Sequence, residues 1–158
     1  MPGGDAPGVA VAVVDASVAV KWVVHEPHSD AAAALLERSI AWVAPRLVLV
    51  EAAAALRRKV ADRQLGAATV TSALAALVDA TRQGTIRLAD DEQLVVQALL
   101  LAVELDHKVP DCVYLALAER EGCPLATADG RLGRLARSRK VPVLGIGTAA
   151  GKGPAPVA

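Results

Sequence analysis

The sequence predicts an α/β domain with a parallel sheet whose strands are connected by crossover helices. Short Val-rich segments alternate with longer segments of helical periodicity, which is the pattern of such a fold. The composition agrees, because 54% of the residues are hydrophobic but the chain has no Phe, two Trp and one Tyr. A core of Ala, Val and Leu suits helices packed closely against a Val-rich sheet. At 158 residues, the chain has the length of a single domain.

The chain begins its predicted structure with a strand over Ala10–Val14, part of an uninterrupted apolar run. A short helix, Ser17–Val24, follows, and Ser17 is expected to cap it because its hydroxyl can accept a free backbone N–H. The polar turn His25–Ser29 separates it from an alanine-rich helix over Asp30–Ser39. A short strand, Ala41–Ala44, comes next.

The middle of the chain is predicted to be mainly helical. Pro45 is expected to open a long helix that runs through Lys59, because proline is favoured in the first turn. Gly66 separates that helix from another over Ala67–Thr81. A short strand over Ile86–Leu88 follows.

A capping-box pattern marks the start of the next helix, which spans 90–105. Asp90 and Gln93 have the spacing at which each side chain bonds the backbone of the other. Four apolar residues are spaced for burial along this helix: Leu94, Val95, Ala98 and Leu101.

The last part of the chain alternates helix and strand. Asp111 is expected to start a helix to about Glu121, and Pro124–Thr127 is a predicted strand. Asp129 starts a basic helix to about Ser138, and Val141–Leu144 completes the sheet.

The bulk properties restrict the classes of protein. Residues 9–146 are expected to fold, between a disordered lead, 1–8, and a flexible tail, 147–158. The lead lacks the order of a secretory signal, and no apolar stretch reaches the roughly twenty residues of a membrane helix. Cys112 and Cys123 are too few for a disulfide scaffold, so reduced thiols in a cytoplasm are expected. Equal numbers of acidic and basic residues, 17 each, mean that any nucleic-acid site is local.

Four carboxylates occur in apolar surroundings. Asp15 directly follows the first predicted strand, Glu51 lies among Leu, Val and Ala, and Asp111 and Asp129 begin helices. An ionised carboxylate in such a place is costly unless a cation, a helix N-terminus or hydrogen bonds receive it. Open α/β sheets build their sites at the carboxyl ends of strands.

Each carboxylate also has an ordinary structural interpretation. Asp111 and Asp129 could simply cap helices, and Asp15 could form an Asx-turn to Ser17. Glu51 could pair with Arg57 or Arg58. Together these readings require four separate explanations, whereas a divalent metal site requires one. Oxygen-only ligands suit Mg²⁺ or Mn²⁺, which activate water and neutralise charge during phosphodiester displacement.

Four segments carry a resemblance to a known family: Val13-Val-Asp15-Ala-Ser-Val, Leu49-Val-Glu51-Ala, Pro110-Asp111-Cys-Val-Tyr-Leu-Ala-Leu-Ala118 and Leu125-Ala-Thr-Ala-Asp129-Gly-Arg-Leu132. In order, spacing and context they resemble the PIN domain and, within it, the VapC-type toxins of bacterial toxin–antitoxin pairs. The resemblance spans about 9–146. Cys112 departs from it, standing where alanine is common.

The resemblance implies a three-layer α/β/α sandwich and a metal-dependent endoribonuclease that a small cognate antitoxin inhibits. It places the acidic quartet on Asp15, Glu51, Asp111 and Asp129, with Asp15 and Asp111 as the direct metal ligands. Glu51 and Asp129 would complete the pocket directly or through water. Two hydroxyls match positions that would orient Asp15: Ser17 and Thr127.

The remaining candidates concern RNA and partners. Arg131 and Arg134 are candidates to bind RNA phosphates beside the metal, although a solvated helix face explains them equally well. The basic run 57–59 has the same ambiguity. His107 is interpreted as a partner of a helix C-terminus, and the helix over 67–81 as a possible homodimer contact.

Three alternatives to a nuclease fit the sequence less well. A non-catalytic PIN-like module that binds RNA or protein would not need four acids. A phospho-acceptor receiver domain would need a second acid near Asp15 and a lysine after the last strand, where the chain has Gly145 and Ile146. A dinucleotide-binding domain would need a Gly-rich loop, which the segment after Val14 lacks.

Overall fold

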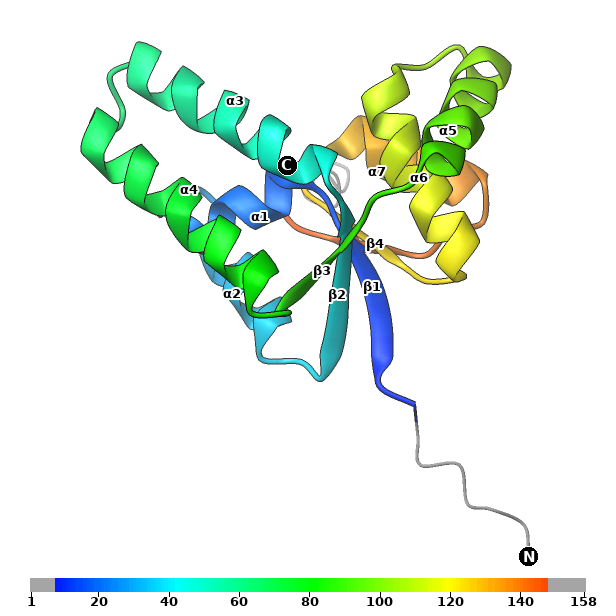
Figure 1. The fold of residues 1–158 in the computed structure, drawn as a ribbon, viewed down its shortest axis with the longest axis horizontal. Coiled ribbons are helices and arrows are strands. Elements are labelled where there is room, and N and C mark those ends of the chain that lie inside the picture. Colours follow the sequence, from blue (N-terminus) through cyan, green and yellow to red (C-terminus); the bar gives the residue numbers. More distant parts are fainter. Residues whose placement is uncertain (1–7, 148–158) are drawn as a thin grey trace, which may run out of the picture.

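A computed structural model describes residues 8–147 and contains a five-stranded sheet with helices on both faces (Figure 1). The strands lie in the order β3-β2-β1-β4-β5, and every neighbouring pair is parallel. The strands are β1 (Ala10–Val14), β2 (Ile40–Pro45), β3 (Ile86–Ala89), β4 (Leu125–Thr127) and β5 (Val143–Gly145). The predicted α/β/α fold class is confirmed.

Helices form the two outer layers. They are α1 (Ala16–Val23), α2 (Ser29–Leu36), α3 (Leu47–Ala61), α4 (Ala67–Arg82), α5 (Glu92–Leu105), α6 (Val109–Glu121) and α7 (Gly130–Ser138). The first four form one group, in which α1 contacts α2, α3 and α4. On the other side of the sheet in Figure 1, α5 packs against α6, and α7 contacts β4 and β5.

The order of the strands creates a switch point beside β1. From β1 the chain proceeds outward to β2 and β3, and it then returns through α5 and α6 to place β4 on the other side of β1. Connections from β1 and β4 therefore leave toward opposite faces of the sheet. In open parallel sheets, the crevice at such a point, at the carboxyl ends of the strands, is where ligands bind.

The middle of helix α6 is buried on all sides. Every residue from Asp111 to Ala118 is buried, because α6 lies between α5 and strands β1 and β2. A helix with this environment has little amphipathic character. It also carries two residues of the candidate site, Asp111 and Tyr114, into the core.

Two helix starts differ from the sequence prediction. Helix α1 begins at Ala16 and is capped by Asp15, not by Ser17, because the Asp15 carboxylate accepts the Val18 N–H. Pro45 does not open α3 but is the last residue of β2, paired with Ala89. Proline has no N–H to donate, so it is tolerated at the end of a strand.

Two further starts are shifted by one or two residues. The cap of α5 is Asp91, which accepts the Leu94 N–H at 2.7 Å, and not Asp90. Val95, expected to be buried, is 56% exposed, because it lies with Val96 and Leu99 on the outer face of α5. Helix α6 begins at Val109, two residues before Asp111, so Asp111 lies in the first turn and does not cap it.

Apart from Gly8 and Gly147, the expected lead, 1–8, and tail, 147–158, lie outside the described residues. Within residues 8–147, no helix is long and apolar enough to cross a membrane. Cys112 and Cys123 are both buried free thiols.

Replacement of Leu117 by alanine tests the importance of α6. Leu117 is fully buried, so Leu117→Ala should lower the free energy of unfolding by about 2–5 kcal/mol through lost burial and a cavity. Chemical denaturation measures this effect. The control is Leu36→Ala at the exposed end of α2, expected to cost less than about 1 kcal/mol. Equal losses in the two variants would contradict the central role of α6.

Candidate active site

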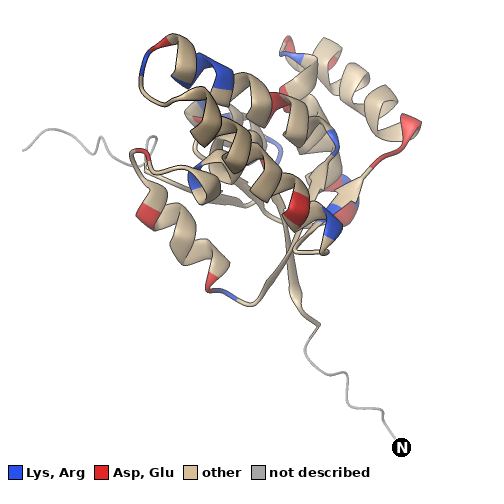
Figure 2. Cartoon of the chain, turned by 60° about the vertical axis from the view of Figure 1, so that its left-hand side comes forward, with Lys and Arg blue, Asp and Glu red and all other residues tan. Residues whose placement is uncertain are grey.

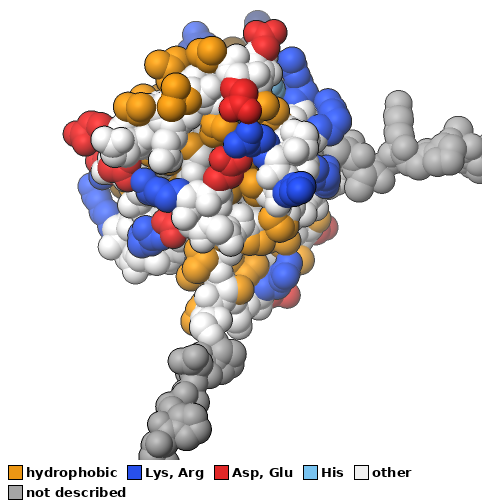
Figure 3. Space-filling model, turned by 90° about the vertical axis from the view of Figure 1, so that its right-hand side faces the viewer, with side chains coloured by type: hydrophobic (Ala, Val, Ile, Leu, Met, Phe, Trp, Pro, Cys, Tyr) orange, Lys and Arg blue, Asp and Glu red, His pale blue; other side chains and the backbone are white. Residues whose placement is uncertain are grey.

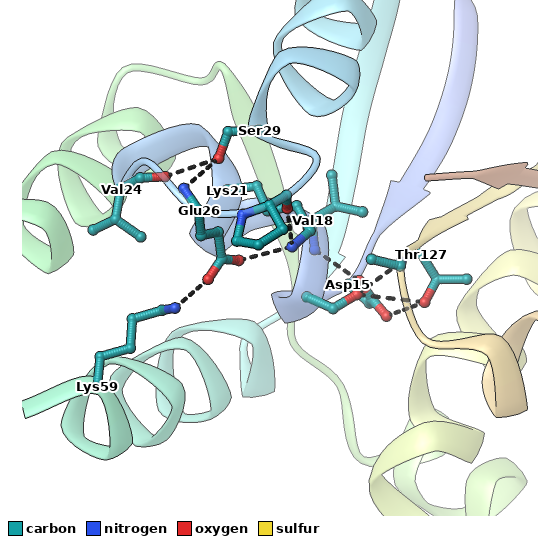
Figure 4. A network of polar contacts seen from close by, with 11 residues as sticks. Asp15, Val18, Lys21, Val24, Glu26, Ser29, Lys59 and Thr127 are labelled. Carbon is teal, nitrogen blue, oxygen red and sulfur yellow. Dashed lines mark hydrogen bonds and ion pairs between the residues drawn. The ribbon is translucent and has the colours of Figure 1, made fainter. Parts of the chain in front are cut away.

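Asp15 is the buried centre of the candidate site. It directly follows β1, and only 4% of its surface is exposed. Its carboxylate accepts hydrogen bonds from the Ser17 hydroxyl at 2.6 Å, from the Val18 N–H at 3.1 Å and from the Thr127 hydroxyl (Figure 4). These donors hold both carboxylate oxygens in place.

The two hydroxyls also join the ends of β1 and β4. Ser17 Oγ accepts the Ala128 N–H at 2.9 Å, and Thr127 Oγ1 accepts the Asp129 N–H at 2.9 Å. Each hydroxyl therefore donates to Asp15 and accepts from the loop after β4. This network fixes Asp15 relative to Asp129 across the switch point.

Burial shifts the ionisation of Asp15. Removal from water raises the pKa of Asp15 from 3.8 to about 6, because the charged form is poorly solvated. The bonds from Ser17, Thr127 and Val18 lower the pKa and offset part of this effect, while the charge of Asp129 raises it slightly. An adjacent cation would favour the ionised carboxylate.

Asp129 caps α7, as predicted. Its Oδ1 accepts the Arg131 N–H at 2.8 Å and the Leu132 N–H at 3.4 Å. The other carboxylate oxygen has no hydrogen bond among the described residues. Capping and a place in the site are therefore compatible for Asp129, because they use different oxygens.

Asp111 is held by two side chains that precede α6. Asp111 Oδ2 lies 2.7 Å from His107 Nε2 and 3.6 Å from Lys108 Nζ. The interpretation of His107 as a partner of a helix C-terminus is wrong for its side chain, which contacts this carboxylate. Since these partners use Oδ2, Oδ1 of the 7% exposed Asp111 is available to the pocket.

One pocket brings the quartet together. Glu51, from α3, lines it with Asp15, Asp111 and Asp129, and the pocket has a volume of about 290 Å³. Tyr114 lines the same pocket from α6. Residues separated by more than a hundred positions in the sequence thus meet at the carboxyl edge of the sheet.

The donor set of the pocket consists of carboxylate oxygens, which suits a hard divalent cation. Within residues 8–147, no group of three or more His, Cys, Asp or Glu side chains is close enough to hold one ion as it stands. Mg²⁺ keeps several waters in proteins and often takes only one or two carboxylates. The pocket therefore fits an ion whose shell is completed by water.

The basic residues near the quartet come from α3, within the basic run 57–59, and from the residue before α6. Arg58 and Lys108 line the pocket, whereas Arg131 and Arg134 are exposed on α7 and do not. Figure 2 shows Lys and Arg toward the end of α3, and Arg58 lies in its last turn. The carboxylate pocket is therefore reached by cations from α3 and the start of α6.

A neighbouring pocket extends from the same site. It shares Ser17, Arg58 and Asp129 with the carboxylate pocket and reaches Lys21 and Lys59. Both lysines bind Glu26, Lys21 at 2.9 Å (Figure 4). Burial alone would raise the pKa of Glu26, but Lys59 and Lys21 together lower it below its usual value.

Two residues that line the pocket, Lys108 and Tyr114, are not among the predicted site residues, and neither is His107, which contacts Asp111. Tyr114 is 1% exposed, as a core residue is, yet it also lines the pocket of the acids. The spacing of 107 and 108 to 111, four and three residues, is a signal for side-chain contact on a helix. Because both residues lie before the first residue of α6, the sequence does not place them on one helix with Asp111.

The structure is therefore an α/β domain with a parallel sheet and a pocket of four carboxylates at the switch point of the sheet. Such a pocket suits a hard cation. The sequence model of the PIN domain matches residues 12–138, and the chain belongs to this family. A comparison with curated proteins finds no match.

Solved structures share the fold. PAE2754 from Pyrobaculum aerophilum is 24% identical, with a TM-score of 0.59 over 79% of this chain and 85% of its own. VapC20 from Mycobacterium tuberculosis, a Sarcin-Ricin loop cleaving toxin, is 19% identical, with a TM-score of 0.64 over 78% and 94%. VapBC2 from Rickettsia felis, bound to a DNA fragment from its promoter, is 12% identical, with a TM-score of 0.59 over 87% and 99%.

The raised pKa of Asp15 predicts how stability varies with pH in chelator. Because the folded-state pKa, about 6, exceeds the unfolded value, the folded protein binds the proton more tightly. This contribution is full below pH 4 and is lost as pH rises through 6. Its size is on the order of 3 kcal/mol.

Thermal unfolding of wild type and Asp15→Asn between pH 4.5 and 7.5 measures this contribution. The wild type should lose more stability than the variant as pH rises. Mg²⁺ should stabilise the wild type more at pH 7 than at pH 5. Parallel pH profiles of the two proteins would contradict the assignment.

Proposed function

We propose that this protein is a metal-dependent endoribonuclease that acts as the toxin of a toxin–antitoxin pair. The observation that carries the proposal is that four carboxylates from separate elements line one pocket at the switch point of the sheet. Isolated capping roles would not require Asp15, Glu51, Asp111 and Asp129 to face the same space.

The reaction is hydrolysis of an RNA phosphodiester bond by water. Mg²⁺ or Mn²⁺, when bound, would lower the pKa of water and neutralise charge on the phosphate. Asp15 and Asp111 would hold the ion, since each is fixed by hydrogen bonds and keeps carboxylate oxygens toward the pocket. Glu51 or Asp129 would position the attacking water.

Cations beside the acids would bind the RNA backbone. Arg58 and Lys108 line the carboxylate pocket, and Lys108 is largely exposed, with 64% of its side chain accessible. Phosphate contacts of this kind position a nucleic acid without reading its sequence. Arg131 and Arg134, at the exposed face of α7, would contact RNA only farther from the site.

A small antitoxin is the proposed regulator. VapBC2 from Rickettsia felis and a toxin–antitoxin complex from Klebsiella pneumoniae share this fold, the latter at 16% identity and a TM-score of 0.53. For this chain, we expect a cognate partner encoded beside it. The reaction, the partner and the reduced thiols suit a cytoplasmic protein.

A homodimer would form through α5 and not through α4. Five large apolar side chains on α5 are more than half exposed: Val95, Val96, Leu99, Leu100 and Val103. They form a stripe on one face, and hydrophobic side chains gather on this side of the molecule in Figure 3. On α4, the exposed positions include no large apolar residue. A self-complementary apolar stripe suits two copies related by twofold symmetry.

Cleavage of total cellular RNA by antitoxin-free protein tests the function. Discrete products should appear with Mg²⁺ or Mn²⁺ and disappear with chelator. Asp111→Asn should lower the rate about 100-fold or more, because it removes a charged ligand. The matched control is Asp79→Asn on the exposed face of α4, which should cleave at the wild-type rate.

The same experiment separates the nuclease from a binding module. RNA that is retained but never cut under either metal would favour the non-catalytic module. Equal cleavage by wild type and Asp111→Asn would contradict the role of the quartet.

Light scattering of two charged variants tests the dimer. Leu100→Glu places a charge on the α5 stripe and should weaken association at least about tenfold, giving monomer at micromolar concentration. Ala76→Glu, on the exposed face of α4, should remain dimeric. The opposite result would favour the helix over 67–81, and a monomeric wild type would exclude both surfaces.

A further inference from the structure

Tyr114 has a buried hydroxyl with no protein partner. The residue is 1% exposed, and its oxygen has no hydrogen bond among residues 8–147. Buried polar groups are nearly always hydrogen-bonded, because leaving one unpaired is unfavourable. This hydroxyl therefore requires an explanation beyond packing.

The hydroxyl faces the carboxylate pocket. Tyr114 lines that pocket with Asp15, Glu51 and Asp111. Burial, followed by the proximity of Glu51 and Asp15, raises the pKa of Tyr114 far above its usual value, whereas the Ala16 backbone N–H opposes this shift. The phenol therefore keeps its proton at neutral pH and can donate it in a hydrogen bond, and of the two acids Glu51 has the larger effect on its pKa.

The core itself needs the ring of Tyr114 but not the oxygen. The ring lies in α6, where neighbours Val113, Leu115 and Leu117 are all apolar and buried. A phenylalanine would fill the same volume without an unpaired polar atom. The chain otherwise contains no Phe and no second Tyr.

We propose that Tyr114 is a positioning residue whose hydroxyl donates a hydrogen bond to the Glu51 carboxylate and orients it toward the bound ion and its water. This inference rests on the proposed function of the pocket. It links α6 to α3 across the site, in the way that Ser17 and Thr127 link β1 to β4. Metal ligands commonly depend on such outer hydrogen bonds.

A single isotope label reports the contact without any cleavage assay. Because Tyr114 is the only tyrosine, incorporation of [¹³Cζ]tyrosine gives one signal from the folded chain. That signal should shift on addition of Mg²⁺ and also in metal-free Glu51→Gln. Asp79→Asn serves as the control and should leave it unchanged. A chemical shift that is the same in wild type and in Glu51→Gln would overturn the proposal.

The variant Tyr114→Phe tests the consequence for the ion. The melting temperature of the metal-free protein should change little, because the phenylalanine ring fills the same space in the core and only one hydroxyl is lost. Calorimetric Mn²⁺ affinity should fall about tenfold or more, with a similar rise in the Mg²⁺ concentration for half-maximal cleavage. The packing control, Leu117→Met one turn along α6, should keep the wild-type affinity.

A double-mutant cycle assigns the effect to Glu51. In the Glu51→Gln background, Tyr114→Phe should change Mn²⁺ affinity less than twofold. An undiminished effect there, or no effect in the wild type, would overturn the proposal. If the label and the cycle behave as expected but no RNA is cut, the proposed function fails while the contact between Tyr114 and Glu51 stands.

Discussion

The burial of one carboxylate, that of Asp15, is the constraint around which the rest of the site is organised. Asp15 ends the central strand, where water is excluded, so its charge must be met by donors from the protein. Those donors are the start of α1 and two hydroxyls, Ser17 and Thr127. Because the hydroxyls also bind the loop after β4, the same carboxylate sets the relative position of two strand ends and of Asp129.

Much of this arrangement follows from the sequence. The alternation of Val-rich and helical segments was sufficient for the parallel fold, and β1 has the predicted bounds. The acids were recognisable because each interrupts an apolar context, and all four line one pocket. The predicted first residues of several helices were less accurate. At α5, Asp90 and Asp91 are both candidate caps, and the backbone conformation that selects Asp91 depends on tertiary packing.

The residues that surround the acids were harder to predict. Arg58 and Lys108 reach the pocket because of how α3 and α6 are placed on the sheet, information that no local pattern contains. The basic stretch of α7 gave a stronger local signal, but Arg131 and Arg134 are exposed and do not line the pocket. Tyr114 shows a different difficulty, because it lies in the middle of a buried helix, where its position indicates a core residue although it also lines the pocket.

The two tryptophans lie together on one side of the molecule. Trp22 of α1 and Trp42 of β2 lie 5.1 Å apart in an edge-to-face pair, and Trp22 donates to the Ala32 carbonyl in α2. All indole emission therefore originates on the side of α1 and α2. The layer of α5, α6 and α7 contains no tryptophan, so its loosening would not change tryptophan fluorescence until it reached the sheet.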